Sequence, residues 1–332
     1  MHYRSTDILG GGISGHIFEQ IISLENLLLA WREFKRGKIS KAEVREFYFN
    51  LEDNLFDLRR QLLFGVYRPS RYAFFYVCDP KLRPIHKATV KDRVVFQAVF
   101  RILYHIFDRN FIYDSYACRF DKGTHLGIER LRKFVNKSSQ NNSRPVFVLK
   151  CDIKKFFYSI DHQILLDLIS RKINDQQLLN LIKIIIDSFH ISPGKGLPLG
   201  NVTSQLFANI YLNELDQFVK HVLKEKYYIR YCDDFVIVGT DYQHLKNLVT
   251  IIDNFLQERL KLILHPNKIE IRKLSQGIDF LGYVTLPHHR VLRTKTKRRI
   301  FKRINNKNRI SYLGMLKHCS GQLLAWLFEK NT

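Results

Sequence analysis

Residues 227–239 read Tyr-Tyr-Ile-Arg-Tyr-Cys-Asp-Asp-Phe-Val-Ile-Val-Gly, and this stretch decides the fold. Aromatic and β-branched residues on both sides favour strands, and the polar centre is typical of a turn. The stretch therefore predicts a β-hairpin with Asp233 and Asp234 at its tip. Neighbouring residues on a regular strand point to opposite faces, so only a turn lets both carboxylates serve one site. Taken alone, the pattern is more typical of an ordinary turn decorated with aspartates.

A third carboxylate, Asp152, ends another predicted strand. Residues 145–152 form a nearly continuous apolar run that fits a buried strand with Asp152 at its end, although an aspartate there could equally cap a helix. Three aspartates suit nucleotidyl transfer, in which two Mg²⁺ about 3.5–4 Å apart activate the attacking hydroxyl and neutralise the leaving pyrophosphate. Mg²⁺ prefers hard oxygen ligands and shares them with substrate phosphates.

The charge of the chain indicates a polyanionic partner. Its 332 residues carry a formal net charge of +23, with 45% hydrophobic residues, so we expect a folded protein that binds nucleic acid or an anionic membrane. No apolar run approaches the roughly eighteen residues of a membrane span, and no signal-peptide pattern begins the chain, which favours nucleic acid. The five scattered cysteines predict reduced thiols in a cytoplasmic protein, without a zinc site or a disulfide.

Three further segments are candidates for phosphate contacts. A predicted hairpin over residues 72–86 places Lys81, Arg83 and Lys87 together, where they could grip a triphosphate or simply protect an exposed edge strand. The glycine-rich loop 194–200 precedes a helix, a weak signal for nucleotide binding. Residues 293–309 contain nine Lys or Arg and no acid, which indicates a surface for a nucleic-acid backbone or, as an alternative, a disordered tail.

Several boundaries can be predicted from local signals. Ser40 and Glu43 have the spacing of a capping box, which predicts a helix from there to about Phe64. Ser311 is expected to cap a last helix, with its apolar positions extending to Leu327. Lys268 is placed within a predicted strand over residues 268–271.

Six ordered blocks in residues 70–290 together resemble the reverse transcriptases. They are Arg83-Pro84-Ile85 with Lys91-Asp92-Arg93-Val94-Val95, Asp152-Ile153-Lys154-Lys155-Phe156-Phe157, Gly196-Leu197-Pro198-Leu199-Gly200, Tyr231-Cys232-Asp233-Asp234, Lys268, and Phe280-Leu281-Gly282-Tyr283. The resemblance implies an α+β right-hand polymerase with fingers, palm and a short helical thumb. It also implies an RNA-directed DNA polymerase that uses two Mg²⁺, with Mn²⁺ as a possible substitute, and binds template RNA, a cDNA or primer strand and dNTPs.

The resemblance assigns roles to individual positions. Asp152, Asp233 and Asp234 match the catalytic metal ligands. The positions that match nucleotide contacts are Lys81, Arg83, Phe157, Leu199, Gly200, Gln205 and Lys268. Among them, Phe157 matches the aromatic residue that excludes a 2′-hydroxyl, Arg83 the fingers residue on the triphosphate, and Lys268 the lysine near the primer end. The expected nucleic-acid contacts of the thumb are Arg293, Lys295, Lys297, Arg298, Arg299, Lys302 and Arg303.

The glycine-rich loop departs from most of the family. Usual members read Pro-Gln-Gly and then Ser-Pro, whereas Leu199 replaces the Gln and Gln205 replaces the Pro. The loop is instead similar to that of reverse transcriptases of diversity-generating retroelements, as are residues 25–28, 116–119, 121–125 and 277–283. Such enzymes copy a template-repeat RNA into cDNA with errors opposite adenines, for diversification of a target gene, and work with a small accessory protein. The resemblance therefore implies a bacterial or phage-encoded enzyme.

The expected domains are an N-terminal helical extension (1–66), fingers (67–145), palm (146–289, with a fingers segment near 170–200) and a basic thumb (290–332). Three other functions stay open: a retron or phage-defence reverse transcriptase, a maturase-type splicing cofactor, and a catalytically dead RNA-binding protein. A retron enzyme is expected to carry Val-Thr-Gly and Asn-Ala-x-x-His motifs, which are absent here. A maturase is expected to have a further RNA-binding domain, and this sequence stops at Thr332. The intact aspartates argue against the inactive protein.

Overall fold

The computed structural model describes residues 16–78, 82–305 and 308–321. The glycine-rich start, the predicted turn at 79–81 with Lys81, and the end of the predicted last helix lie outside these ranges. The chain divides into two compact units. The first comprises residues 1–110 and 157–211, and the second comprises residues 111–156 and 212–332.

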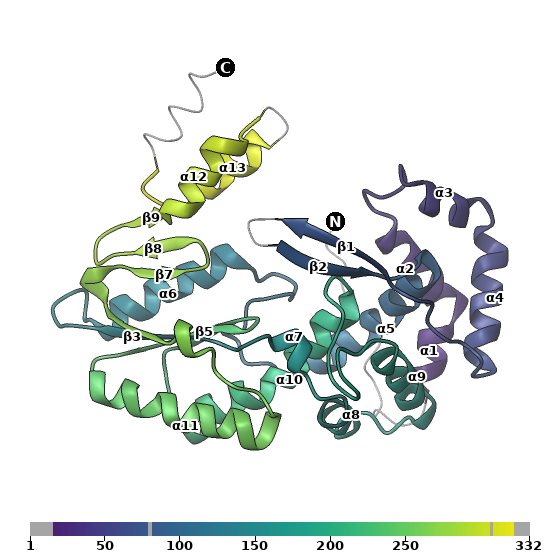
Figure 1. Ribbon diagram of the computed structural model, residues 1–332, viewed down its shortest axis with the longest axis horizontal. Coiled ribbons are helices and arrows are strands. Elements are labelled where there is room, and N and C mark those ends of the chain that lie inside the picture. Colours follow the sequence, from purple (N-terminus) through teal and green to yellow (C-terminus); the bar gives the residue numbers. More distant parts are fainter. Residues whose placement is uncertain (1–15, 79–81, 306–307, 322–332) are drawn as a thin grey trace. The chain divides into compact units, whose positions relative to one another are not determined.

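The first unit is built mainly from helices (Figure 1). Their bounds are α1 (Ile17–Ile22), α2 (Leu24–Phe34), α3 (Ala42–Phe49), α4 (Leu51–Leu63), α5 (Val90–Asp108), α7 (Phe156–Ser159), α8 (His162–Ser170), α9 (Gln176–Asp187) and α10 (Val202–Gln217), of which α10 continues into the second unit. Helix α5 packs against α1, α2 and α3. Its first turn is fixed by Thr89, whose hydroxyl accepts a hydrogen bond from the backbone N–H of Asp92.

The predicted helix from Ser40 to Phe64 is wrong in two respects. It is interrupted at Asn50, so that two helices, α3 and α4, replace one. The capping box is also absent, because α3 begins after Lys41 and Ser40 does not cap it. Glu43 instead accepts hydrogen bonds from Lys87 at 2.6 Å and from Arg93 at 2.9 Å.

A two-stranded hairpin in the first unit confirms the strands predicted over residues 72–86. Strand β1 (Ala73–Cys78) pairs antiparallel with β2 (Leu82–Lys87), with Ala73 opposite Lys87 and Val77 opposite Arg83. All of β1 is exposed, which leaves its aromatic side chains on the surface of the described residues.

The second unit is organised around a four-stranded antiparallel sheet in the order β4-β5-β3-β6. Its strands are β3 (Phe147–Asp152), β4 (Tyr228–Tyr231), β5 (Asp234–Gly239) and β6 (Glu270–Lys273). Helices α6 (Thr124–Ser138) and α11 (Tyr242–Leu260) cover opposite faces of this sheet (Figure 1). The core beneath α6 joins its residues Leu131, Phe134 and Val135 to Val148 and Val236 of the sheet. The buried strand ending in Asp152 and the hairpin at 227–239 are both confirmed.

The C-terminal part of the second unit carries a smaller sheet, β7-β8-β9, followed by two helices. The bounds are β7 (Ile278–Phe280), β8 (Tyr283–Thr285), β9 (Arg290–Leu292), α12 (Thr294–Arg303) and α13 (Arg309–Leu316). Tyr283 and Leu316 share a buried cluster with Ile128 of α6, and Arg290 forms an ion pair with Glu129 of α6 at 2.9 Å. The predicted cap by Ser311 is wrong, since α13 begins after Asn308.

Short helices also flank the sheet of the second unit, and one of them, the 3-10 helix η3 (Leu274–Gln276), directly follows β6. The π-helix η1 (Phe218–Val222) continues α10, and the 3-10 helix η2 (Pro266–Lys268) precedes β6. The prediction that Lys268 lies within the strand is wrong, because Lys268 ends η2 and β6 begins at Glu270. No helix within the described ranges is long and apolar enough to cross a membrane.

Candidate active site

The tip of the central hairpin is a two-residue turn. Strand β4 ends at Tyr231 and β5 begins at Asp234, which pair with each other, so Cys232 and Asp233 form the loop. Cys232 has a φ of 56°, a left-handed backbone conformation that residues other than glycine rarely adopt. Such strain persists only where the surroundings hold it, and it is common at functional sites.

Strand pairing brings the third aspartate to the hairpin. Asp152 lies directly opposite Asp234 in the β3–β5 register. Residues opposite each other in an antiparallel pair have Cβ atoms about 4.5–5.5 Å apart on the same face. The backbone N–H of Ile153 also donates to the carbonyl of Asp233 at 3.3 Å. The three aspartates predicted from the sequence thus come from two segments and meet at one end of the sheet.

Burial and the close approach of the three carboxylates raise the pKa values of two of them, Asp233 and Asp234. Burial raises the pKa of Asp234 to about 6, and the neighbouring charges of Asp233 and Asp152 act in the same direction. Burial, followed by the charge of Asp152, also raises the pKa of Asp233. The positive charge of Lys150 opposes the shift at Asp234. Because like charges disfavour ionisation, this group is electrostatically suited to a bound cation.

Lys268 supplies a cation to this cluster. Its Nζ donates a hydrogen bond to Oδ1 of Asp152 at 2.6 Å, and the Asp152 carboxylate is nearly buried. The neighbouring backbone is fixed as well, because His265 donates its N–H to the carbonyl of Asp152 at 2.8 Å. The structure therefore brings Lys268 to the three aspartates, as a counter-ion for one of them.

A buried ion pair holds the central hairpin in place. The guanidinium of Arg230 donates two hydrogen bonds to Asp216, at 2.7 and 2.6 Å, and both side chains are fully buried. Tyr228 donates a third bond to Asp216 at 2.8 Å. Arg230 also donates to the carbonyl of Cys232 at 3.1 Å, so it connects the ion pair to the strained turn. Sequence analysis did not identify this pair, although an arginine inside an apolar strand is a signal that could have found it.

The first unit collects several of the predicted nucleotide contacts. Leu197 donates its N–H to the carbonyl of Phe157 at 2.7 Å, and His86 on β2 donates to the carbonyl of Leu199 at 3.3 Å. These bonds place the glycine-rich loop beside Phe157 and beside the strand that carries Arg83. Arg83 is exposed, and Leu199 is half-buried.

Two other loop positions lie nearby in the first unit. Gly200 has a φ of 108°, and a Cβ there would lie 3.3 Å from Ile85 on β2, so a larger residue would be strained. Gln205 is exposed on α10. The loop is thus held against β2 by both contact and conformation.

Sequence analysis named Asp92 only as part of a family block and did not predict that its carboxylate is a buried hydrogen-bond acceptor. Asp92 is completely buried and accepts hydrogen bonds from Tyr67 at 2.8 Å, from the N–H of Ser70 at 3.0 Å and from Thr89 at 2.6 Å. It fixes the start of α5 and the chain that leads into β1. Asp92, which belongs to the family block at residues 91–95, therefore has a structural role: it positions the start of α5.

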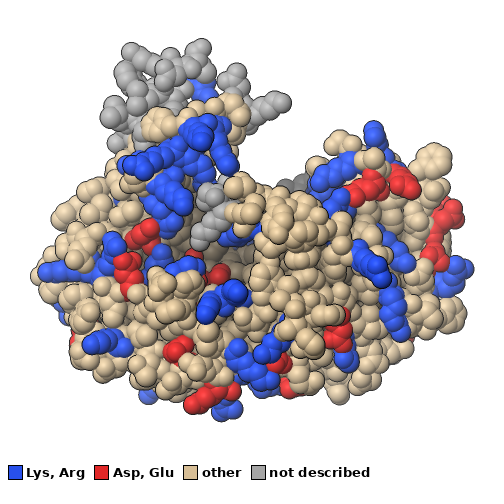
Figure 2. All heavy atoms as spheres, in the orientation of Figure 1, with Lys and Arg blue, Asp and Glu red and all other residues tan. Residues whose placement is uncertain are grey.

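The predicted basic surface forms helix α12 and its N-cap, Arg293. Lys and Arg side chains gather over this helix (Figure 2, upper part). Thr296 and Ile300 are buried beneath it, whereas four of the predicted contacts are exposed, namely Lys295, Arg298, Lys302 and Arg303. Lys297 and Arg299 are half-buried. Arg293 is engaged in an ion pair with Asp279.

The chemistry of the aspartates fits a divalent metal ion. All three present hard carboxylate oxygens, and two have raised pKa values that an adjacent cation would relieve. Within residues 16–78, 82–305 and 308–321, however, no three His, Cys, Asp or Glu side chains are arranged to hold a metal ion. One oxygen of Asp152 is taken by Lys268.

Comparison with known proteins identifies the family. Residues 79–285 match the family model of the reverse transcriptases (RNA-dependent DNA polymerases), well over half of the chain. The chain therefore belongs to the reverse transcriptase family. The expected enzyme class, an RNA-directed DNA polymerase, is confirmed. Members of this family generally use divalent metal ions and act on an RNA template with a primer.

The curated relatives include proteins of group II introns. The chain is 27% identical to protein YkfC of Escherichia coli over 281 residues, which cover 72% of this chain and 71% of YkfC. It is 25% identical to the group II intron-encoded protein LtrA of Lactococcus lactis over 306 residues, which cover 70% of this chain and 49% of LtrA. The chain thus spans about half the length of LtrA.

Two telomerase structures share the fold. That of Candida tropicalis has a TM-score of 0.51 and 13% identity, covering 72% of this chain and 60% of the telomerase chain. That of Candida albicans, solved with a telomeric RNA fragment, has a TM-score of 0.51 and 11% identity, covering 72% and 51%. At these identities the likeness concerns the fold alone. It confirms the expected α+β right-hand polymerase fold.

Proposed function

We propose that this chain is the reverse transcriptase of a diversity-generating retroelement. It copies a template-repeat RNA into cDNA with errors opposite adenines, and the cDNA serves to diversify a target gene. The observation that carries this proposal is Leu199, an aliphatic residue where most of the family has glutamine. Its carbonyl bonds to His86 of β2, so the residue lies beside the strand that carries the proposed triphosphate contact, Arg83.

The proposed chemistry is centred on three carboxylates. Asp152, Asp233 and Asp234 would hold two Mg²⁺, or Mn²⁺ in their place, and bound ions would supply activation of the 3′ hydroxyl of the primer and neutralisation of the pyrophosphate. Lys268 neutralises part of the carboxylate charge and contacts the primer end. These roles rest on the match to the family motifs and on the convergence of the aspartates at one end of the sheet.

The remaining predicted residues have supporting roles in this proposal. Arg83, with Lys81, contacts the triphosphate, and Phe157 excludes a 2′-hydroxyl from the sugar pocket. Gly200 allows the glycine-rich loop to approach the nucleotide closely. Gln205, which follows the loop on α10, is a further proposed nucleotide contact. Helix α12 contacts the phosphates of the template and primer strands.

The domain assignment is likewise a proposal. Residues 67–145 form the fingers, residues 146–289 form the palm with a fingers segment near 170–200, and residues 290–332 form the thumb. Residues 1–66 are an extension that packs on the fingers. A small accessory protein of the retroelement is the proposed protein partner, and the enzyme acts in the bacterial cytoplasm, encoded by the host or by a phage.

Leu199 provides a physical basis for low fidelity. Discrimination between nucleotides is a difference in free energy, and about 1.4 kcal/mol corresponds to a tenfold ratio. An aliphatic side chain cannot make the hydrogen bonds of glutamine, so selection of the correct nucleotide is relaxed by about that order.

The test is Leu199→Gln, with the cDNA sequenced after copying a template rich in adenines. We expect errors opposite adenine to fall about tenfold, while errors opposite other bases change little. The matched controls are Leu199→Met, which keeps an apolar side chain, and Ile191→Gln, which adds an amide at an exposed position of the same unit. An error spectrum that is the same in Leu199→Gln and Leu199→Met would contradict the proposal.

A maturase-type function is the second candidate, because the relatives include LtrA. The two candidates make different predictions for the DNA beside the gene. Two neighbouring repeats that differ mainly at adenines support the retroelement, whereas flanking intron sequences that the protein helps to splice support the maturase.

A further inference from the structure

A second basic site lies in the second unit, away from the three aspartates. It is a cavity of about 240 Å³ between α6, η1 and the start of β4. The chain at Asp114 and Ser115 borders it, since Arg230 of β4 donates its N–H to the carbonyl of Asp114 and Tyr116 donates to that of Arg230. This segment therefore runs alongside β4, the edge strand of the sheet.

Helix α6 presents one cationic stripe to this cavity. Arg130, Lys133, Phe134 and Lys137 all line it. Their spacing of three and four residues places them on the same side of a helix. Like charges at positions four apart, as in Lys133 and Lys137, repel each other on a helix, and a bound anion would relieve this repulsion.

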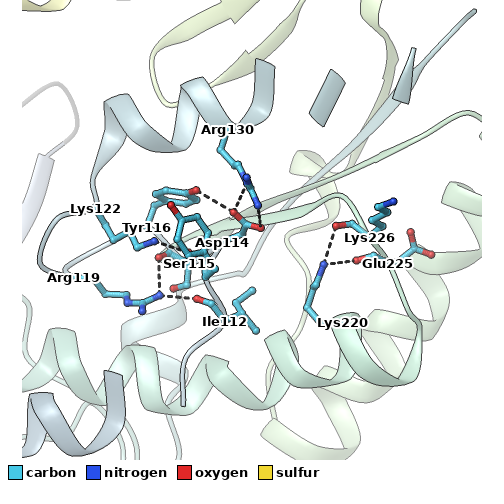
Figure 3. A network of polar contacts seen from close by, with 11 residues as sticks. Ile112, Asp114, Ser115, Tyr116, Arg119, Lys122, Arg130, Lys220, Glu225 and Lys226 are labelled. Carbon is cyan, nitrogen blue, oxygen red and sulfur yellow. Dashed lines mark hydrogen bonds and ion pairs between the residues drawn. The ribbon is translucent and has the colours of Figure 1, made fainter. Parts of the chain in front are cut away.

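The opposite wall adds two more cations. Lys220 and Lys226 line the cavity, and Asp114 is the only acidic residue in its lining as far as the structure describes the chain. Figure 3 shows how two of the five cations are already engaged: Arg130 points to Asp114, and Lys220 points to two backbone carbonyls.

The engaged cations are held firmly. Arg130 donates to Asp114 at 2.7 and 3.2 Å. Lys220 donates to the carbonyls of Glu225 and Lys226 at 3.0 and 2.8 Å, and burial lowers its pKa. The carboxylate of Glu225 is itself paired with His244 at 2.7 Å.

Three lysines of the cavity have no carboxylate partner among the described residues: Lys133, Lys137 and Lys226. All three are exposed. The cavity thus combines rigid inner cations with outer cations that are available for a ligand. Five positive charges against one negative charge make it selective for anions.

Aromatic rings stand among these cations. Tyr227 lines the cavity, its ring packs on Phe134 at 5.1 Å between centroids, and Lys226 lies 5.6 Å from it. Next to the cavity, Tyr113 is 67% exposed, and its ring has Lys122 at 3.3 Å and Arg130 at 5.2 Å from its centroid. Cations that follow a phosphate backbone, interleaved with rings on which bases stack, are the elements of single-strand binding surfaces.

The site is separate from the aspartates. Tyr227 precedes the first residue of β4, whereas Asp233 follows its last residue. At about 3.3 Å per residue, the four steps from Tyr227 to the end of β4 at Tyr231, where the turn begins, span roughly 13 Å. A ligand in the cavity can therefore be bound while the active site is occupied.

We propose that this cavity binds a single strand of nucleic acid through its phosphates, with a base stacked on Tyr113 or Tyr227. The strand is a segment outside the primer–template duplex in the active site. The combination of lysines that have no carboxylate partner with aromatic rings favours such a strand over an acidic protein, which would use the charges but not the rings. This proposal does not depend on the diversity-generating role.

The test uses the double variant Lys133→Glu/Lys137→Glu. A short primer–template first fills the active site, and binding of a labelled oligouridine and of an oligothymidine, each of about 16 nucleotides, is then measured as salt is varied. We expect affinity for the preferred strand to fall at least about tenfold. The slope of log affinity against log salt should fall by about 1.4, or 0.7 for each phosphate that the variant no longer neutralises. The two oligonucleotides distinguish RNA from DNA.

The matched control is Lys246→Glu/Arg259→Glu, which makes the same change in net charge on exposed positions of α11 in the same unit. It should leave the salt slope unchanged, and neither double variant should alter extension of the short primer–template. Tyr113→Leu should lower affinity without lowering the slope, because it removes stacking and no charge.

Three results would overturn the proposal. Equal losses in the α6 and α11 variants would mean that only net charge matters, and unchanged strand binding in both would exclude the cavity as a site. Loss of binding to polyglutamate with intact binding to both oligonucleotides would assign the cavity to an acidic protein instead.

Discussion

Arg230 and Asp216 form a fully buried, bidentate ion pair, and the same guanidinium donates to the carbonyl of Cys232 in the turn of the central hairpin. Removal of one partner from a buried pair leaves an uncompensated charge. We therefore predict that Arg230→Met lowers the free energy of unfolding by about 3–5 kcal/mol, measured by chemical denaturation.

The control for this prediction is Arg230→Met combined with Asp216→Leu, which removes both charges. The double variant should recover most of the lost stability. Its primer extension should stay impaired, because the carbonyl of Cys232 still lacks its donor. A single variant as stable as the wild type would show that the pair does not support the hairpin.

Asp234→Asn separates stability from activity. Burial and the charges of Asp233 and Asp152 disfavour the ionised carboxylate, and the pKa of Asp234 is raised to about 6. Removing that charge should increase the free energy of unfolding at neutral pH by on the order of 1 kcal/mol, measured with a chelator present. Primer extension should fall to background. A variant that is less stable than the wild type would contradict this electrostatic account of the site.

Glu43 makes the stability of the first unit depend on pH. Burial tends to raise its pKa, but hydrogen bonds and charges from Lys87 and Arg93 outweigh it and lower the pKa below the ordinary value of 4.5. The stabilising effect is therefore present above pH 4.5 and is lost as pH falls through the lower, folded-state pKa.

Glu43→Gln should cost no more than about 1 kcal/mol at pH 7, since about a third of the side chain is exposed and solvent screens the pair. The difference from the wild type should vanish in acid. Glu46→Gln, at an exposed position of the same helix, serves as the control and should show neither effect. If Glu43→Gln still lowered the stability in acid, its effect would come from altered packing and not from the loss of charge.

The basic face of α12 should dominate the salt dependence of duplex binding. If Lys295, Arg298 and Lys302 each contact one phosphate, replacing all three by alanine should lower the slope of log affinity against log salt by about 2.7, or 0.9 per phosphate. The measurement is a titration of an RNA–DNA duplex at several salt concentrations. Lys246→Ala is the control, and an equal slope in the triple variant would remove α12 from the interface.

Local sequence signals correctly predicted the elements whose residues favour one secondary structure without help from distant parts of the chain. The apolar run before Asp152 and the aromatic and β-branched flanks of the central hairpin favour strands through their own composition, and the structure has strands there. Family motifs then placed the three aspartates together, which no local pattern could do.

The failures arose where distant residues intervene. Glu43 matched a capping box, but Lys87 and Arg93, 44 and 50 residues away, bind its carboxylate. Lys268 looked like a strand residue, yet its chain turns after Pro266 and its amine reaches Asp152, 116 residues earlier. Asp216 and Arg230 lie on different elements, and only the folded chain shows that they meet.

The hydrogen bond between Lys268 and Asp152 has a consequence for the charge at this end of the sheet. The protein supplies a positive charge of its own to the carboxylates, so part of their mutual repulsion is offset within the folded chain itself. The lysine is held by a 2.6 Å hydrogen bond to a nearly buried carboxylate, and a cation bound to that same oxygen would have to displace its amine. The position of the Lys268 amine would therefore depend on whether a cation occupies that oxygen.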